Sequence, residues 1–222
     1  MYNVAKFLHR VPLFSGLNEA ELETLARSGS HKSIAKNELL MHQGAPGASL
    51  YVVLTGSVKV VLTQGDGKEI TLSLRHPGDF VGEMALIDDE PRSANVIAVE
   101  ATECFVLSRR DFQRCLTGNM SLAINLIKGL CRRLRETDRK VADLALRDVS
   151  DRVMHTLRDL ARTEADRTVI PKKLSQQDIA NMVGASREMV NRVLRELTQA
   201  GRIEMCDGQI VILDTAATRE LV

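Results

Sequence analysis

Residues 174–197 read LSQQDIANMVGASREMVNRVLREL, and this stretch decides how the C-terminal part of the chain folds. Ser175 is a good N-cap residue followed by amphipathic spacing, which predicts a first helix over 176–183. Gly184 permits the left-handed backbone of a tight turn, and Ser186 can cap a second helix directly after it. The stretch therefore predicts two helices joined by a short turn.

The second helix, over 187–200, has an apolar face and a polar face, and its polar face can read bases. Arg can bridge O6 and N7 of guanine, and Glu can accept from the amine of cytosine. The alternative is a charged face that is only solvated. The hairpin predicted over 203–213, turning at Asp207-Gly208, favours DNA reading because it completes a helix-turn-helix with a wing. Lys172 and Lys173 are candidate phosphate contacts. The predicted DNA-binding residues are Lys172, Gln176, Ser186, Arg187, Glu188, Asn191 and Arg192.

A long helix is predicted upstream of this motif, over 119–147. Its apolar positions are spaced alternately three and four residues apart, with charged residues on the other faces, which is the pattern of a coiled coil. Packing on its own domain is the alternative, but one narrow seam per chain favours a homodimer. The seam consists of Met120, Ala123, Ile127, Leu130, Leu134, Thr137, Val141 and Leu144.

Short β runs separated by glycine and proline turns fill the chain from Ser30 to Leu107. Regularly spaced short strands predict an antiparallel roll. Together the patterns predict an α+β fold: a β-roll domain over 1–118, a dimerisation helix over 119–147 and a winged helix-turn-helix over 148–222. The expected strands cover 49–54, 57–62, 70–74, 95–99 and 103–107.

Composition narrows the class of protein. The net charge of +1 indicates no acidic or basic character, so a DNA surface must come from local arrangement. The sequence contains no apolar run long enough to predict a membrane segment or a signal peptide, so we expect a cytoplasmic protein. The four cysteines lack metal-ligand spacing and no nucleophile is paired with a histidine, so we expect neither a metal site nor an enzyme.

The stretch Gln177-Asp178-Ile179-Ala180-x-x-Val183-Gly184-Ala185-Ser186-Arg187-Glu188-x-Val190-x-Arg192 resembles the helix-turn-helix of the cyclic-AMP receptor protein family, the CRP/FNR regulators. The resemblance extends over nearly the whole chain. It implies that Arg187, Glu188 and Arg192 read the bases of a half-site similar to TGTGA. Two such half-sites in a palindrome would bind a homodimer, with RNA polymerase as a further partner.

A second motif lies in the predicted roll. Gly82 lets the backbone approach a ligand, Glu83 can accept from hydroxyls, and Arg92 with Ser93 can hold an anion. A turn with a surface Glu–Arg pair is the alternative. Gly82-Glu83-Met84-Ala85-Leu86 with Arg92-Ser93 is also similar to the phosphate-binding cassette of cyclic-nucleotide domains. That resemblance implies that Glu83 binds the ribose 2′-hydroxyl and that Arg92 and Ser93 bind the cyclic phosphate.

The resemblance assigns the base contact to Thr137 and Asp138 on the long helix. Thr137 interrupts the apolar seam, and the alternative is that it only tunes register. An ionised Asp138 can only accept, so it suits the amine of adenine and equally N1–H and N2–H₂ of guanine. The predicted effector is therefore cyclic AMP or cyclic GMP, with cyclic di-GMP, another signal or no ligand as alternatives. The predicted ligand-binding residues are Gly82, Glu83, Met84, Arg92, Ser93, Thr137 and Asp138.

Overall fold

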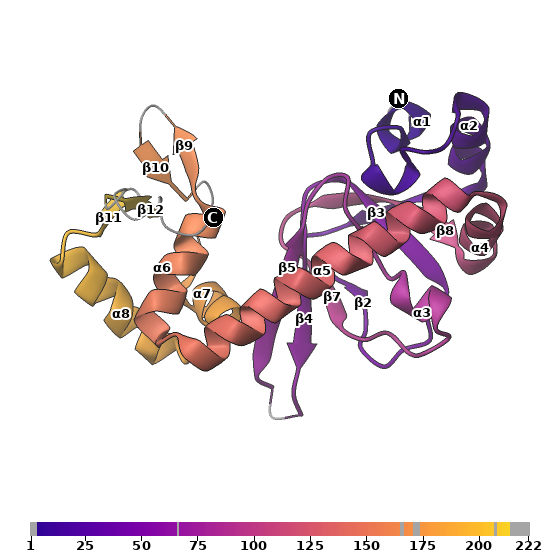
Figure 1. Ribbon diagram of the computed structural model, residues 1–222. Coiled ribbons are helices and arrows are strands. Elements are labelled where there is room, and N and C mark those ends of the chain that lie inside the picture. Colours follow the sequence, from indigo (N-terminus) through magenta and orange to yellow (C-terminus); the bar gives the residue numbers. More distant parts are fainter. Residues whose placement is uncertain (1–3, 66, 165–166, 171–173, 207, 214–222) are drawn as a thin grey trace. The chain divides into compact units, whose positions relative to one another are not determined.

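The computed structural model describes residues 4–65, 67–164, 167–170, 174–206 and 208–213. The chain divides into two compact units, Met1–Thr137 and Asp138–Val222. The division falls inside the longest helix, α5 (Met120–Leu146), which therefore contributes residues to both units (Figure 1). The three-part division at 118 and 147 remains a prediction, although α5 lies within its middle segment.

The N-terminal unit consists of short helices around two antiparallel sheets. Its helices before α5 are α1 (Val4–Leu8), the 3-10 helix η1 (Pro12–Phe14), α2 (Glu19–Ser28), α3 (Met84–Ile87) and α4 (Arg109–Gly118). Its strands are β1 (Ser30–Ile34), β2 (Leu39–Met41), β3 (Ser49–Thr55), β4 (Val58–Thr63), β5 (Glu69–Arg75), β6 (Phe80–Val81), β7 (Asn95–Ala98) and β8 (Thr102–Ser108).

The two sheets have the strand orders β1-β8-β3-β6 and β2-β7-β4-β5. The hairpin of β4 and β5 is paired from Val58 with Arg75 to Thr63 with Glu69. β3 pairs along its length with β8, which comes nearly fifty residues later in the chain. All the pairings are antiparallel, which confirms the predicted roll.

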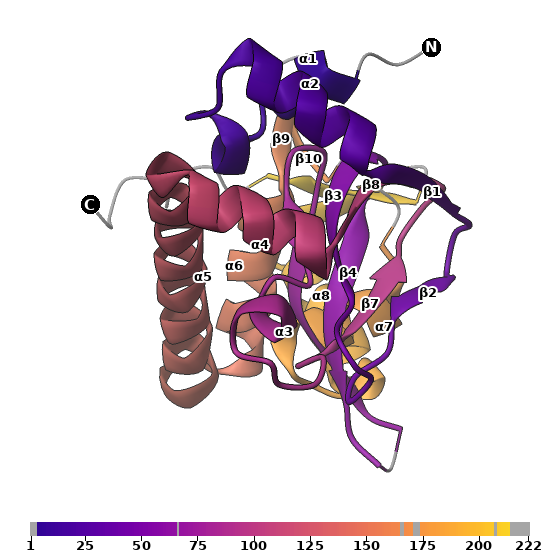
Figure 2. The same cartoon turned by 90° about the vertical axis from the view of Figure 1, so that its right-hand side faces the viewer.

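Alternation along β3 gives the roll two apolar layers, because successive side chains of a strand point to opposite faces. Leu50, Val52 and Leu54 face a core built with the helices. Val53 faces the second core, between the sheets. Figure 2 shows α4 beside β3 and β8, with α2 next to α4. The helical core also takes Phe80, Leu86, Phe105, Phe112, Leu122 and Leu126.

The face of α5 that packs on the roll is not the predicted seam. Leu122, Leu126 and Gly129 are the buried residues of this helix. The seam lies on a neighbouring face that is largely exposed in the single chain: the exposed fraction is 58% for Ile127 and 62% for Leu134, while Leu130 packs partly on the helical core. The helix therefore has one apolar face for its own unit and a second that the described part of the chain leaves largely exposed.

The C-terminal unit after α5 comprises α6 (Val149–Leu160), β9 (Arg162–Glu164), β10 (Arg167–Val169), α7 (Gln176–Val183), α8 (Arg187–Gln199), β11 (Ile203–Cys206) and β12 (Gln209–Ile212). Its sheet has the order β11-β12-β10-β9. Leu157 of α6, Ile179 of α7 and Val193 of α8 meet in one core, which also takes Ile203 and Ile212 of the hairpin. The predicted helix-turn-helix with its β-hairpin is confirmed.

Candidate functional site

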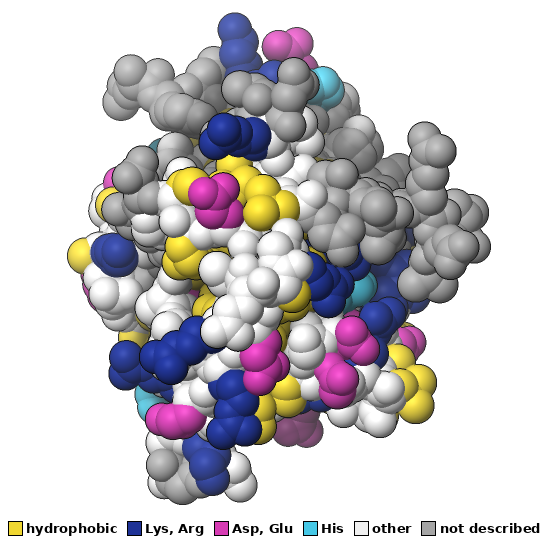
Figure 3. Space-filling model, turned by 90° about the vertical axis from the view of Figure 1, so that its left-hand side faces the viewer, with side chains coloured by type: hydrophobic (Ala, Val, Ile, Leu, Met, Phe, Trp, Pro, Cys, Tyr) yellow, Lys and Arg dark blue, Asp and Glu magenta, His cyan; other side chains and the backbone are white. Residues whose placement is uncertain are grey.

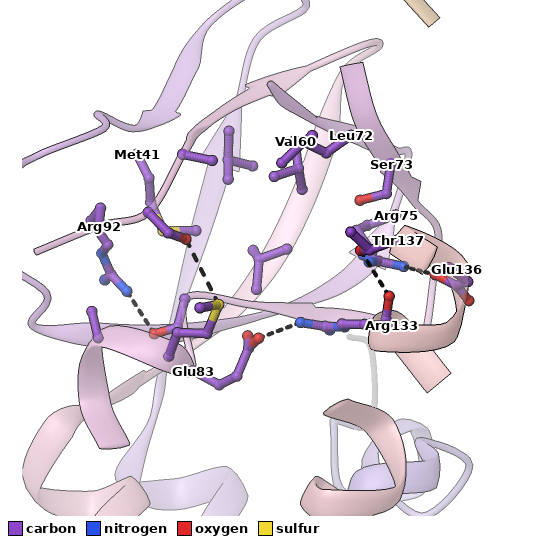
Figure 4. Close-up of a pocket in the computed structure, with 17 residues that line it drawn as sticks. Met41, Val60, Leu72, Ser73, Arg75, Glu83, Arg92, Arg133, Glu136 and Thr137 are labelled. Atoms are coloured by element: carbon purple, nitrogen blue, oxygen red, sulfur yellow. Dashed lines mark hydrogen bonds and ion pairs between the residues drawn. The ribbon is translucent and has the colours of Figure 1, made fainter. Parts of the chain in front are cut away.

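A cavity of about 190 Å³ opens in the N-terminal unit, between the sheet that holds β4 and β5 and the middle of α5 (Figure 4). Its walls combine apolar side chains with several charged ones. The lining residues named from sequence are Gly82, Glu83, Met84, Arg92, Ser93 and Thr137, and those that sequence reasoning missed include Ser73, Arg75, Arg133 and Glu136.

Arg92 is fixed in place by backbone carbonyls. The side chain is buried, its Nη1 donates to the carbonyl oxygen of Gly82 at 2.6 Å, and its Nη2 donates to that of Ser49 at 2.7 Å. Gly82 has a φ of +89°, and a Cβ there would lie 2.5 Å from Nη1 of Arg92. Only glycine fits both the left-handed backbone and this close approach. Burial lowers the pKa of Arg92, so an anion that pairs with this cation inside the cavity would be stabilised.

Glu83 offers an unused acceptor. Its side chain is buried, and its Oε1 accepts from Nη1 of Arg133 on α5. Its other oxygen, Oε2, is buried and has no hydrogen-bond partner within the described structure. A buried acceptor left unpaired costs about 1–3 kcal/mol, so a hydroxyl group that donates to Oε2 would be stabilised there.

Arg133 joins the cavity to α5. Besides Glu83, its guanidinium donates to the carbonyl oxygen of Phe80 and lies over the Phe80 ring, 4.4 Å from its centre. Burial lowers the pKa of Arg133, while the charge of Glu83 acts against that shift. Sequence reasoning missed this residue, since only its position one helical turn before Thr137, on the same side of α5, distinguishes it from the neighbouring arginines.

The remaining predicted ligand residues differ in their placement. Ser93 donates from Oγ to Sδ of Met84 at 3.8 Å, and Thr137 donates from Oγ1 to the carbonyl oxygen of Arg133 at 2.9 Å. Both hydroxyls belong to side chains that line the cavity. Asp138 is exposed and is not among the lining residues. In the single chain, the predicted base contact is therefore represented by Thr137 alone.

The helix-turn-helix has the local structure that its sequence predicts. Ser175 and Asp178 form a capping box at the start of α7, each accepting from the backbone N–H of the other. Gly184 ends α7 in the left-handed conformation, with φ +63°. Ser186 caps α8 by accepting from the backbone N–H of Met189. These caps fix where α7 begins and ends and where α8 begins, and so which side chains α8 presents.

The predicted reading face of α8 is at the surface. Arg187, Glu188 and Arg192 are exposed, while Asn191 is half-buried and its Oδ1 accepts from Nε2 of Gln176 at 3.3 Å. The pKa of Glu188 is lowered by hydrogen bonds that its carboxylate accepts from the backbone N–H of Glu188 itself and from the side chain of Ser186. Figure 3 shows Lys and Arg side chains at the surface of this unit, interspersed with acidic ones. Lys172 and Lys173 lie outside the described residues.

Three further features bear on other kinds of site: metal-ligating groups, cysteines and long apolar helices. No group of three or more His, Cys, Asp or Glu residues there could hold a metal ion. None of the four cysteines, all of which are described, forms a disulfide, and burial raises the pKa of Cys104 to about 12, which keeps that thiol protonated. No described helix is long and apolar enough to span a membrane.

Comparison with known families matches both units. The cyclic nucleotide-binding domain family matches residues 31–119, which include most of the cavity residues. The Crp-like helix-turn-helix domain family matches residues 151–221, which include α7 and α8.

Individual relatives match nearly the whole chain. The cyclic AMP receptor protein of Thermus thermophilus is 32% identical over 95% of this chain and 96% of its own. The cAMP-activated global transcriptional regulator CRP of Salmonella typhimurium is 36% identical over 83% of this chain and 90% of its own. A solved structure of the c-di-GMP responsive global regulator CLP of Xanthomonas campestris has 28% identity and a TM-score of 0.77, over 88% of this chain and 99% of its own. The chain therefore belongs to the CRP family of DNA-binding transcription regulators, with a cyclic nucleotide-binding domain and a Crp-like helix-turn-helix.

Proposed function

We propose that a cyclic mononucleotide, cyclic AMP or cyclic GMP, binds in the cavity and controls the affinity of the helix-turn-helix for DNA. The observation that carries this proposal is the buried pair of Arg92 and Glu83. One offers a cation held by carbonyls, and the other offers an unpaired acceptor, Oε2, in the same cavity. A cyclic phosphate suits the first and a ribose hydroxyl the second.

Each predicted ligand residue has a part in this proposal. Arg92 and Ser93 bind the phosphate, Glu83 binds the 2′-hydroxyl, and Gly82 and Met84 shape the wall around them. Thr137 contacts the base from α5. Asp138 follows Thr137 on α5 but does not line the cavity of the single chain. It would therefore contact the ligand only in a dimer.

A homodimer is part of the proposal because α5 leaves an apolar face uncovered. Ile127, Leu134 and Val141 recur at heptad spacing with exposed fractions of 58%, 62% and 59%. A second copy of the helix would remove this surface from water, at roughly 25 cal/mol per Å² of apolar area. The ligand would then bind beside the dimer interface, and its binding would favour one arrangement of the DNA-binding units over others.

On DNA, we propose that Arg187, Glu188 and Arg192 read bases. The other predicted residues would contact the phosphate backbone of the DNA or hold the reading side chains in place: Gln176, Ser186, Asn191 and Lys172. A dimer would place two such helices on half-sites one DNA turn apart, about 34 Å, so a palindromic site is expected. Control of transcription from such a site implies RNA polymerase as a further partner and a cytoplasmic location.

Cyclic di-GMP is the second candidate effector. The observation that favours it is the similarity to the structure of a regulator described as responsive to c-di-GMP, which extends over 88% of this chain.

Calorimetric titration of the purified full-length protein with cyclic AMP, cyclic GMP and cyclic di-GMP tests the proposal. We expect one of the mononucleotides to bind with micromolar affinity or better, and we expect Arg92→Ala to abolish that binding. Arg110→Ala is the matched control, because Arg110 is exposed on α4 and does not line the cavity. Absence of binding heat with all three nucleotides would overturn the proposal. Binding heat with cyclic di-GMP alone would mean that cyclic di-GMP, and not a mononucleotide, is the effector.

A further inference from the structure

Three arginines line the cavity, and the protein itself fixes the guanidinium groups of two of them. Both terminal nitrogens of Arg92 donate to backbone carbonyls. Those of Arg133 donate to Glu83 and to the carbonyl oxygen of Phe80. These two guanidinium groups are therefore fixed by the protein before any ligand enters.

Arg75, at the end of β5, is the exception. Its Nη1 lies 3.8 Å from Oε2 of Glu136, whose side chain is 56% exposed. Its Nε is buried and has no hydrogen-bond partner within the described structure. The side chain of Arg75 is itself only 13% exposed, and solvent does not reach its Nε. A half-buried cation with one long ion pair and an unpaired buried donor would be stabilised by a ligand that completes its bonding.

The position of Arg75 suits one part of a nucleotide. Figure 4 shows Arg92 on one side of the cavity and Arg75, with Glu136 and Thr137, on the other. The apolar side chains of Val60 and Leu72 also line the cavity. If Arg92 holds the phosphate and Glu83 the ribose, the base extends toward the side on which Arg75 lies.

We propose that Arg75 reads the base of the bound nucleotide and shifts the preference of the site toward guanine. The guanidinium fork can donate to O6 and N7 of guanine together. Adenine presents the N7 acceptor beside the N6 amine, which is a donor, so one N–H of the fork would face another donor. The inference rests on the proposed function, since it assigns the base end of the same cavity.

A purely structural role for Arg75 makes a different prediction. In that role, Arg75 would hold β5 to α5 through the ion pair with Glu136, and removing either partner would have the same effect. Glu136→Gln breaks the ion pair and leaves the fork of Arg75 in place. Base reading therefore predicts that Glu136→Gln keeps the preference for guanine, while Arg75→Met loses it.

The test compares affinities of the full-length protein for cyclic GMP, cyclic IMP and cyclic AMP by calorimetry. Cyclic IMP keeps O6 and N7 but lacks the 2-amino group, so it separates the contact of Arg75 from any contact of Asp138. We expect Arg75→Met to reduce the ratio of affinities for cyclic GMP over cyclic AMP about tenfold, and the ratio for cyclic IMP over cyclic AMP by a similar factor. Arg75→Lys keeps the charge without the fork, and we expect it to lose most of the same preference.

The possible failures are distinct. If the wild type binds these nucleotides and Arg75→Met and Arg75→Lys leave both ratios unchanged, the inference is wrong and the proposed function stands. Equal loss of the ratios in Glu136→Gln would also overturn base reading in favour of the structural role. If the wild type binds none of the three, the proposed function fails and the inference fails with it.

Discussion

The arginines of the cavity and those of α8 are held in opposite ways. Arg92 is 7% exposed, and two backbone carbonyls fix its guanidinium. Arg187 and Arg192 are exposed, and the described residues give them no ion pair. The first is positioned before a ligand arrives, whereas we expect the others to become ordered only on contact with DNA. Substitutions in the cavity should therefore lower both the free energy of unfolding and the affinity for ligand. Substitutions of the exposed arginines of α8 should lower only the affinity for DNA.

Gly82→Ala should have the largest effect on stability. Its Cβ would lie 2.5 Å from Nη1 of Arg92 and 3.0 Å from the carbonyl oxygen of Ser49, at a φ of +89°. We expect it to lower the free energy of unfolding by about 2 kcal/mol or more, measured by urea denaturation. Gly44→Ala is the matched control, because Gly44 has a φ of +81° with nothing within 4 Å of its Cβ. Equal losses in both variants would contradict the close packing around Arg92.

Arg192→Ala should separate binding from stability. We expect affinity for a duplex with two inverted TGTGA-like half-sites to fall about tenfold or more, because a base contact by Arg contributes ~1–3 kcal/mol. The free energy of unfolding should change by no more than about 0.5 kcal/mol, since the side chain is exposed. Fluorescence anisotropy measures the first and urea denaturation the second. A destabilised variant, or one with unchanged DNA affinity, would break the contrast with the cavity.

Ser186→Ala should cost about 1 kcal/mol of unfolding free energy, because the serine accepts from the backbone N–H of Met189 at the start of α8. Ser186→Asp restores an N-cap acceptor and should stay close to the wild type. Thermal unfolding of the three proteins measures the difference. If alanine and aspartate have the same effect, capping is not what the hydroxyl contributes.

The smallest expected effect concerns the pH dependence of Glu188. Hydrogen bonds lower its pKa, so its contribution to stability is fully present above the usual pKa of about 4.3 and is lost as the pH falls through the lower value of the folded state. NMR titration of the side chain should show the depressed pKa. In Ser186→Ala, which removes one of these bonds, the pKa of Glu188 should move toward its ordinary value. No movement would mean that the hydroxyl has no part in it.

The sequence predicts the helix-turn-helix more completely than the cavity, because the signals of the former are local. Ser175, Gly184 and Ser186 act on residues within four positions of themselves, and each is seen in its expected role. The strands of the roll were also predictable where they alternate. β6 and α3, with two and four residues, are too short for any periodicity to reveal them.

The cavity is built from long-range contacts that no local pattern contains. Glu83 and Arg133 are fifty residues apart, and Arg75 and Glu136 are farther apart still. The residues that we propose for the phosphate could be recognised because they are close together in the sequence. At the proposed base end, the resemblance supplied Thr137, but Arg75 and Arg133 could not be recognised, since they become lining residues only when α5 packs against β5 and β6.

The most direct test of the account is DNA binding with and without nucleotide. Fluorescence anisotropy would follow the full-length protein on the palindromic duplex and on one with scrambled half-sites, with the cyclic nucleotide that calorimetry identifies. We expect the nucleotide to raise affinity for the palindrome at least about fivefold, as allosteric coupling typically does. Arg92→Ala should bind DNA without responding to the nucleotide. Equal DNA affinity of the wild type with and without saturating nucleotide would contradict the claim that the cavity controls the helix-turn-helix.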